Sequence, residues 1–314
     1  MDGRTFTVTA LMQLFIEQVL NGIGNGVVYG SVALALVLIF RTTGILNFAQ
    51  GEMALFSTYI TWKLASESDG FGLPIVAAIG ISMAIAFIAG AAIERVLIRP
   101  VEQARSPLNV VIVTLGLFLG LNSVAQLIFG TDPQLMPSPF PDGNVELFSS
   151  GGDAVVVSKA TIGLVLVLLA ECLLLWFLLQ RTKLGLKLRA VASNPDSARL
   201  HGIKAGTMLM LGWAMAAAIG ALAGSLVASQ RTGFDGSLMQ IIIVYAFAAA
   251  ALGGFDSLIG AVVAGVVVGI ADALTIQYVD PLEGIEVVVP LGLIFVVLII
   301  LPNGLFGRRT VERV

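Results

Sequence analysis

The chain has 314 residues, of which 57% are hydrophobic and 12% charged, and its formal net charge at pH 7 is −3. Because an ordinary soluble domain carries about 25% charged residues, this chain has too little polar surface to cover a water-soluble fold, and its surplus apolar surface is expected to face lipid. The small net charge gives no indication of nucleic-acid binding, and the single cysteine, Cys172, excludes a disulfide framework.

The N-terminus carries no short basic segment with a small-residue cleavage site, so the first apolar run is expected to be a membrane helix. A helix that crosses a membrane needs roughly 20 mainly apolar residues, and roughly eight to ten spans are expected here. The apolar runs are Leu14–Phe40, Leu46–Ala65, Leu73–Ile93, Leu108–Phe129, Thr161–Gln180, Met208–Ala228, Met239–Leu252, Leu258–Leu274 and Ile285–Leu301. The sequence therefore predicts an all-α, polytopic transmembrane bundle with residues 1–314 in one domain.

Two of these runs are weaker candidates for complete spans. Leu46–Ala65 contains polar side chains near its start, and Met239–Leu252 is short. A re-entrant or broken helix is therefore a candidate structure near residues 44–60.

The charges of the connecting stretches predict which side of the membrane each one faces. Lys and Arg are concentrated in Glu94–Pro107, Arg181–Lys204 and the C-terminal tail, whereas residues 130–160 and Thr275–Gly284 are mainly acidic. Cytoplasmic loops carry an excess of Lys and Arg. We therefore expect the three basic stretches in the cytoplasm and the two acidic ones outside. The N-terminus then lies outside only if Leu46–Ala65 crosses the membrane.

Many of the 35 glycines are spaced four residues apart, which places them on one helix face. Small residues on one face let two membrane helices approach closely. The sequence predicts dense helix packing at these positions, with glycines along a substrate path as the alternative. The spaced sets are Gly22, Gly26 and Gly30, then Gly116 and Gly120, Gly220 and Gly224, and Gly265 and Gly269.

Polar side chains within the apolar runs are candidates for a functional site because they are costly in lipid. Asn47, Gln50 and Glu52 interrupt the second run, where they either stabilise a broken helix or line a path through the membrane. Asn122 and Gln126 lie four apart and so face one way, either toward a neighbouring helix or toward such a path.

Two further acidic residues have competing interpretations. Glu171 lies near the middle of its run, where pairing with a neighbour or a subunit contact is favoured over substrate binding. Asp272 lies near the outer end of its run, so plain solvent exposure is as reasonable as a functional role.

The inventory of reactive residues disfavours several kinds of chemistry. One histidine, His201, and one cysteine are too few ligands for a zinc or iron site. Serines within the runs, such as Ser31, Ser57 and Ser225, have no plausible His partner for a Ser-His-Asp hydrolase. The chain also contains no G-x-x-x-x-G-K-[ST] motif to cradle nucleotide phosphates. We therefore expect neither a metal site nor an enzyme activity.

The stretch 181–206 is too polar to enter lipid, yet its pattern is ordered. Asn194 is a favourable N-cap residue, and Pro195 suits the first helical position, so a short helix is expected over Pro195–His201. The preceding residues Leu184–Ala192 have apolar side chains at helical spacing. The more specific interpretation is that this stretch docks to a partner protein. The alternative is a basic juxtamembrane loop that touches anionic lipid.

Part of this stretch, GLKLRAVASNPDSARLHGIKAG, resembles the cytoplasmic loop of permeases in the branched-chain amino-acid ABC importer family, of the high-affinity leucine/isoleucine/valine uptake type. In that family the corresponding helix contacts the ATPase, so the resemblance implies that 181–206 is a cytoplasmic coupling loop. The resemblance implies that the positions of this stretch that match the family motif, together with the neighbouring Arg199, couple the permease to the ATPase. The matching positions are Gly185, Arg189, Ala190, Ala192, Asn194, Ala198, Gly202 and Ile203.

Two more segments resemble the same family, in the same order along the chain. They are NGIGNGVVYGSVALALVLIFRTTGILNFAQGEMALFSTY near the N-terminus and LPNGLFGRR near the C-terminus. Tyr29 stands at a tyrosine of the first motif and joins Asn47, Gln50, Glu52, Asn122 and Gln126 as a translocation-path candidate. Gln50 departs from the family, in which many members carry His, and because Gln cannot titrate, a proton-coupled role there is doubtful.

The resemblance implies a multi-pass translocation subunit in the bacterial inner membrane that passes branched-chain or related amino acids. It also implies the partners: a second, different permease, two cytoplasmic ATPases that hold the ATP and Mg²⁺, and an extracytoplasmic solute-binding protein. No cofactor is expected on this chain. The alternatives are an importer of the same class for urea or short amides, and an ion-coupled secondary transporter, which often shows repeats and charged midplane residues.

Overall fold

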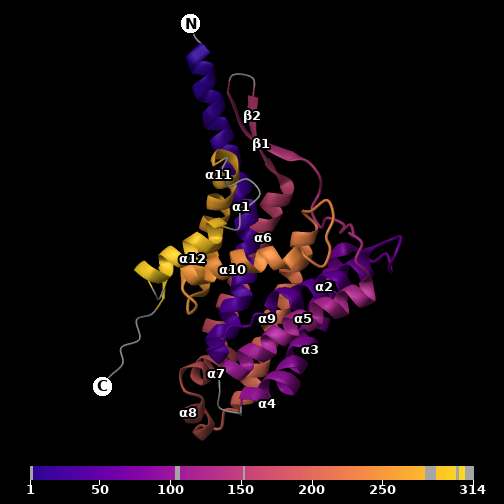
Figure 1. The fold of residues 1–314 in the computed structure, drawn as a ribbon, viewed down its shortest axis with the longest axis vertical. Coiled ribbons are helices and arrows are strands. Elements are labelled where there is room, and N and C mark those ends of the chain that lie inside the picture. The colour runs from indigo at the N-terminus through magenta and orange to yellow at the C-terminus, as the bar shows by residue number, and fades with distance from the viewer. Residues whose placement is uncertain (1–2, 103–106, 151–152, 280–287, 302–303, 308–314) are drawn as a thin grey trace.

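The computed structural model describes residues 3–102, 107–150, 153–279, 288–301 and 304–307, and it confirms a polytopic bundle of helices (Figure 1). The helices are α1 (Gly3–Thr43), α2 (Gln50–Ala65), α3 (Ile75–Ile93), α4 (Arg99–Glu102), α5 (Pro107–Phe129), α6 (Lys159–Arg181), α7 (Lys183–Ser193), α8 (Pro195–Leu200), α9 (Ala205–Ala228), α10 (Leu238–Gly253), α11 (Leu258–Tyr278) and α12 (Val288–Ile300). A π-helical turn, η1 (Glu94–Ile98), joins α3 to α4.

Each of the nine predicted apolar runs coincides with a helix. By length and composition alone, six helices within the described residues could cross a membrane, and they correspond to the first, third, fourth, fifth, sixth and eighth runs. The other three runs correspond to the shorter helices α2, α10 and α12, of 16, 16 and 13 residues. The start of the last run, residues 285–287, lies outside the described residues.

Helix α1 is the central element of the bundle. Its 41 residues span about 60 Å at 1.5 Å per residue, twice the hydrocarbon thickness, and its N-terminal part projects beyond the other helices (Figure 1). From Gly26 to Ile39 every residue is buried, against α11, α9, α10 and α6. Because the apolar surface of this stretch faces protein on all sides, α1 forms the axis around which the others pack.

The glycines of α1 and α11 form one close seam. A methyl group at Gly26 would lie 2.6 Å from Cα of Val266, and one at Gly265 would lie 2.5 Å from Cα of Gly30. Real side chains do not tolerate such distances, so only glycine lets the two backbones approach this closely. The predicted packing role is confirmed here. Gly116 and Gly120 of α5 differ, because a methyl group on either would meet nothing within 4 Å.

The chain breaks between α1 and α2, inside the segment predicted to be re-entrant or broken. Gly44 adopts a positive φ of 71° and its N–H donates to Phe40 O over 2.7 Å, which ends α1. Helix α2 starts at Gln50 and spans about 24 Å, less than a full hydrocarbon core. It is nevertheless buried along most of its length between α9, α3 and α5.

The acidic and basic stretches lie at opposite ends of the bundle (Figure 1). At one end, β1 (Asn144–Ser150) and β2 (Asp153–Ser158) form an antiparallel hairpin that the sequence pattern did not predict. Backbone hydrogen bonds between Gln134 and Phe234 tie this connection to the α9–α10 turn. Helices α4, α7 and α8 lie at the other end. This arrangement is consistent with the predicted sides, although the C-terminal tail (308–314) and residues 280–284 lie outside the described residues.

Candidate functional site

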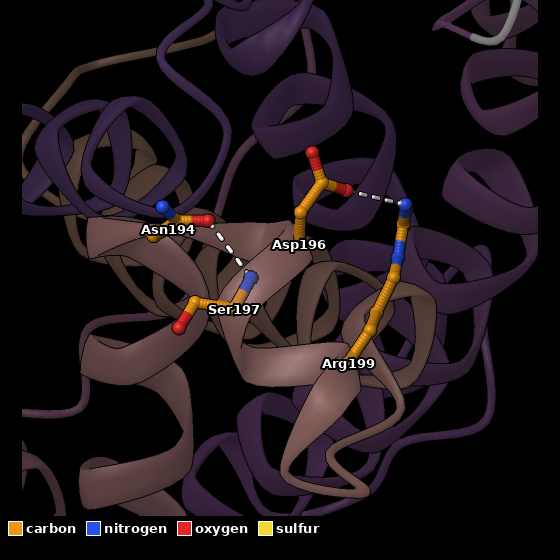
Figure 2. Close-up of polar contacts among 4 residues, drawn as sticks. All are labelled: Asn194, Asp196, Ser197 and Arg199. Carbon is orange, nitrogen blue, oxygen red and sulfur yellow. Dashed lines mark hydrogen bonds and ion pairs between the residues drawn. The ribbon is translucent and has the colours of Figure 1, made fainter.

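The predicted short helix of the basic loop is present and is capped as expected. Asn194 Oδ1 accepts a hydrogen bond from Ser197 N over 2.9 Å at the start of α8 (Figure 2). Pro195 occupies the first turn, where its missing N–H costs nothing, and Asp196 pairs with Arg199 at 3.0 Å on the exposed side. These local interactions explain why a helix of only six residues forms here.

The end of α8 is also fixed by its own backbone. Gly202 adopts a φ of 77°, and Ile203 N donates to Ala198 O over 3.0 Å, which closes the turn. The side chain of Leu200 is 88% exposed at this tip. A short, fixed helix therefore presents Arg199 and Leu200 outward at the basic end of the bundle.

Helix α7 joins α8 to the membrane part of the bundle. Leu188 and Val191 are buried, and α7 contacts α6, α1 and α9. Gly185 is buried where a methyl group would overlap the carbonyl groups of Leu178 and Leu179. Arg189 Nη1 donates to Gln180 Oε1 over 3.0 Å, while Ala190 is half-buried. The predicted coupling residues thus divide into an inner set that packs and an outer set that is exposed.

Asn47 and Gln50 have structural partners at the break before α2. Asn47 Oδ1 accepts from Ala49 N over 3.0 Å, and Gln50 Nε2 donates to Ala216 O of α9 over 3.0 Å. Both side chains are 1% exposed or less. Gln50 lies against Gly220, where a methyl group would be 2.7 Å from its Nε2. These contacts favour the interpretation that both residues stabilise the broken helix.

Glu52, Asn122 and Gln126 form one hydrogen-bonded cluster between α2 and α5. Asn122 Nδ2 donates to Glu52 Oε2 over 2.9 Å and to Gly236 O over 2.8 Å, and Gln126 Nε2 donates to Asn122 Oδ1 over 2.5 Å. The Oε1 atom of Glu52 is buried and has no hydrogen-bond partner among the described residues. Asn122 makes the interhelical hydrogen bond expected of this pair, whereas Gln126 bonds to Asn122 within α5.

Tyr29 lies apart from these residues, in a cluster centred on Asp272. Tyr29 and Tyr245 stack with ring centroids 4.5 Å apart, and their hydroxyls donate to Asp272 Oδ2 and Oδ1 over 3.3 and 2.7 Å. Asp272 is 3% exposed, so the interpretation as a solvated residue is wrong. The structure therefore divides the six path candidates among three sets of contacts.

Glu171 has the neighbour that the sequence favoured. Ser31 Oγ of α1 donates to Glu171 Oε2 of α6 over 2.7 Å, and both side chains are buried. This bond joins α6 to the central helix within the apolar part of the bundle.

A cavity at the acidic end brings Tyr29, a path candidate, together with residues that the sequence patterns did not reveal. It has a volume of about 310 Å³, and Asn21, Asn25 and Tyr29 of α1 and Arg231 line it. An adjoining cavity shares Arg231 and includes Asp235. The Ser237 hydroxyl and backbone N–H donate to Asp235 Oδ1 and hold the pKa of that carboxyl below its ordinary value. The four-residue spacing of Asn21 and Asn25 was the one local signal available.

Comparison with known proteins gives a family that matches most of the chain. The family model described as "Branched-chain amino acid transport system / permease component" matches residues 18–298. The high-affinity branched-chain amino acid transport system permease protein LivH of Escherichia coli K12 is 29% identical over 309 residues, 96% of this chain and 98% of the relative. LivH of Salmonella typhimurium is 30% identical, and BraD of Pseudomonas aeruginosa, a permease protein of the same description, is 29% identical, each over 310 residues with the same coverage.

The match to the family model covers nearly the whole bundle, from within α1 through the break before α2 and the α7–α8 loop to within α12. A transport permease is a membrane subunit rather than an enzyme, which agrees with the long apolar helices. The chain belongs to the family of permease components of branched-chain amino acid transport systems.

Proposed function

We propose that this chain is the translocation subunit of an ATP-binding-cassette importer in the bacterial inner membrane, and that it passes branched-chain or related amino acids. The observation that carries the proposal is α8, a capped helix that presents Arg199 and Leu200 at the basic end of a family-member permease. The absence of a phosphate-binding motif from the sequence supports placing ATP hydrolysis on another chain.

The proposal assigns a partner to each end of the bundle. At the basic, cytoplasmic end, two ATPase subunits hold ATP and Mg²⁺ and one of them contacts the 181–206 loop. At the acidic, extracytoplasmic end, a solute-binding protein delivers its ligand near the 130–160 loop. A second, different permease completes the passage, and lipid surrounds both chains. The proposal includes no cofactor on this chain and no nucleic acid.

The packing of α7 and α8 suggests how force reaches the membrane part. Ala198 of α8 and Leu188 and Val191 of α7 are buried, so the two short helices form one packed unit. Through α7 this unit contacts α1 and α9, which are the two most buried of the candidate membrane spans. A push on the exposed face of α8 would therefore move core helices rather than a loose loop.

The coupling residues have distinct roles in this proposal. Gly185, Ala190, Ala198, Gly202 and Ile203 give the loop its shape, and Asn194 starts α8. Arg189 and Arg199 provide exposed positive charge, and Leu200 adds an exposed apolar contact. An exposed apolar side chain beside a charged rim suits the surface of a protein partner.

Uptake by proteoliposomes tests the importer mechanism. The chain is reconstituted with its partner permease, ATPases and binding protein, and leucine uptake is measured with ATP inside. We expect uptake that requires ATP and both ATPases and that persists when ionophores abolish ion gradients. Uptake that disappears with the ion gradient and does not need the ATPases would establish the ion-coupled secondary transporter instead.

A pull-down tests the coupling loop directly. Leu200→Glu changes only an exposed side chain of α8, and Arg199→Glu removes an exposed ion pair while the Asn194 cap and the buried Ala198 remain. We expect both variants to lose association with the ATPase and to lose ATP-driven uptake. Association and uptake equal to those of the wild type would overturn the assignment of α8 as the coupling helix.

Competition during uptake tests the substrate class. Unlabelled leucine, isoleucine or valine is expected to inhibit labelled leucine uptake by the complete system, whereas urea and acetamide are not. Uptake of urea or a short amide in place of the amino acids would favour the alternative substrate class.

A further inference from the structure

The outer cavity, the one lined by Asn21, Asn25, Tyr29 and Arg231, is open on one side and lined by parts of the chain that are distant in sequence. Its wall is formed by the middle of α1 (Asn21–Tyr29), the start of α6, and the turn between α9 and α10 with adjoining residues of both helices. Tyr29 lines the inner end of the cavity. It precedes Thr43, the last residue of α1, by 14 residues, so it lies about 21 Å from that end of the helix. The cavity lies at the end of the bundle that faces the proposed binding protein.

Three polar side chains of this cavity lack partners within the described part of the chain, whereas Tyr29, Ser158 and Gln230 have them. The Arg231 guanidinium and the side-chain amides of Asn21 and Asn25 make no hydrogen bond or ion pair with any described residue. The nearby carboxylate of Asp235 accepts its hydrogen bonds from Ser237 instead. One cation and two amides therefore face the same space with their hydrogen-bonding capacity available.

Arg231 is carried by a well-defined turn. Its N–H donates to Ala228 O over 3.2 Å, and Gln230 N donates to Val227 O over 3.0 Å. Three residues further on, the Phe234 backbone pairs with Gln134 of the outer connection. The backbone that carries the guanidinium is thus held at two points.

The remaining wall of the cavity is aliphatic. Val28, Leu164, Val227 and Ile242 line it, and each is less than 9% exposed. A cavity that combines one cation, amide groups and an aliphatic wall has the chemistry of a zwitterion with an aliphatic side chain. Its volume of about 310 Å³ is within the range of small-ligand sites, of roughly 300–1,000 Å³.

We propose that the outer cavity is a binding site for a zwitterionic aliphatic amino acid on the permease itself. Arg231 donates to the carboxylate, the amide oxygens of Asn21 and Asn25 accept from the ammonium group, and the side chain rests on Val28 and Leu164. This inference rests on the proposed transport function and adds a place where the substrate pauses after its release from the binding protein.

Tyr29 gives this site an inner boundary. Its ring stacks on Tyr245 and its hydroxyl is held by Asp272, so these two residues fix the side chain that bounds the inner end of the cavity. Passage beyond the site requires α1 to separate from α10 at the Tyr29–Tyr245 stack. The bound amino acid therefore waits on the outer side until the bundle changes conformation.

Ligand binding to the assembled complex tests the proposal. The complex of both permeases and the ATPases is placed in nanodiscs without its binding protein, and saturation-transfer NMR measures the affinity for three probes. The probes are leucine, leucinamide, which lacks the carboxylate, and 4-methylpentanoate, which lacks the ammonium group. Arg231→Gln is compared with the wild type, and Lys63→Gln, an exposed cation of α2 held by Asp69 O, is the matched control.

We expect Arg231→Gln to lower the affinity for leucine and for 4-methylpentanoate about tenfold, which is the effect of one charge-assisted hydrogen bond. The affinity for leucinamide should not change. Lys63→Gln is expected to bind all three probes as the wild type does. Equal leucine affinity in Arg231→Gln and the wild type would overturn the proposal, as would an equal loss of all three probes, which indicates a merely structural role.

A second variant changes the size of the cavity rather than its charge. Leu164→Phe fills space beside Val28, so leucine affinity is expected to fall at least about fivefold while alanine affinity changes less. Unchanged leucine affinity in this variant would place the ligand elsewhere. Weaker docking of the binding protein to Arg231→Gln with normal leucine binding would show that Arg231 serves the protein partner instead, and would also overturn the proposal.

The failure of this inference differs from the failure of the importer function. If the wild-type complex takes up leucine with ATP while the cavity variants bind and transport leucine normally, only the outer site is wrong. If the wild-type complex with its binding protein takes up no amino acid with ATP, the importer function itself is wrong.

Discussion

Asn122 Nδ2 donates a hydrogen bond to Glu52 Oε2 over 2.9 Å and thereby joins the peripheral helix α5 to the buried helix α2. The same amide donates to Gly236 O in the turn before α10. Helix α5 packs mainly on α2, and its other main helix contacts are with α4 and η1, which precede it in the chain. This one side chain therefore connects three elements that are distant in sequence.

Asn122→Ala should destabilise the protein by about 1–3 kcal/mol, because it leaves a buried carboxyl group without its hydrogen-bond donor. Ser123→Ala is the matched control, since the Ser123 hydroxyl donates only to Leu119 O of its own helix. Thermal unfolding of the purified protein in detergent measures the difference. Equal midpoints for the two variants would show that the Asn122–Glu52 bond contributes nothing to stability.

Much of the fold follows from local sequence patterns. Apolar runs of the right length predicted the helices, and the Asn194-Pro195 pair predicted where α8 starts. The spacing of the glycines predicted close helix packing, and the structure shows that the partners are α1 and α11. Each of these features depends on residues within a few positions of one another, so a single sequence carries the signal.

The site depends on contacts that no local pattern reveals. Tyr29 meets Asp272 across 243 positions, and Asn122 meets Glu52 across 70. Asp272 looked exposed because its run ends nearby, yet Tyr245 and Tyr29 cover it. Arg231 is a single cation in a short turn, and only the fold places it beside Asn21 and Asn25.

Asn194→Ala should loosen α8 without disturbing the membrane part. Loss of an N-cap costs about 0.5–2 kcal/mol, so the amides of residues 196–203 should exchange several-fold faster with solvent deuterium. Asn194→Asp is the control, because Asp keeps an acceptor for Ser197 N and suits the positive end of the helix. Hydrogen exchange read by mass spectrometry tests this, and identical protection in the Ala variant would exclude the cap as a determinant of α8.

Gly265→Ala should disrupt the seam between α1 and α11. The added methyl group would lie 2.5 Å from Cα of Gly30, and overpacking of this kind costs about 1–3 kcal/mol. Gly116→Ala adds the same methyl group to α5, where nothing lies within 4 Å, and should be neutral or slightly stabilising in the isolated chain. The unfolding midpoints of the two variants decide the matter. If Gly265→Ala unfolds at the same temperature as the wild type, the backbones of α1 and α11 can move apart without loss of stability.

Tyr245→Phe removes a buried hydroxyl that donates to Asp272 Oδ1 over 2.7 Å while leaving the stack with Tyr29 in place. The loss should lower stability by about 1–3 kcal/mol, because the carboxyl of Asp272 keeps its burial but loses a donor. Tyr59→Phe is a close control, since the buried Tyr59 hydroxyl has no hydrogen-bond partner among the described residues. We expect thermal unfolding to show a lower midpoint for Tyr245→Phe and no decrease for Tyr59→Phe. If the two variants have the same unfolding midpoint, the hydrogen bonds to Asp272 do not hold α1, α10 and α11 together at this depth. The stacked rings of Tyr29 and Tyr245, rather than their hydroxyl groups, would then close the inner end of the outer cavity.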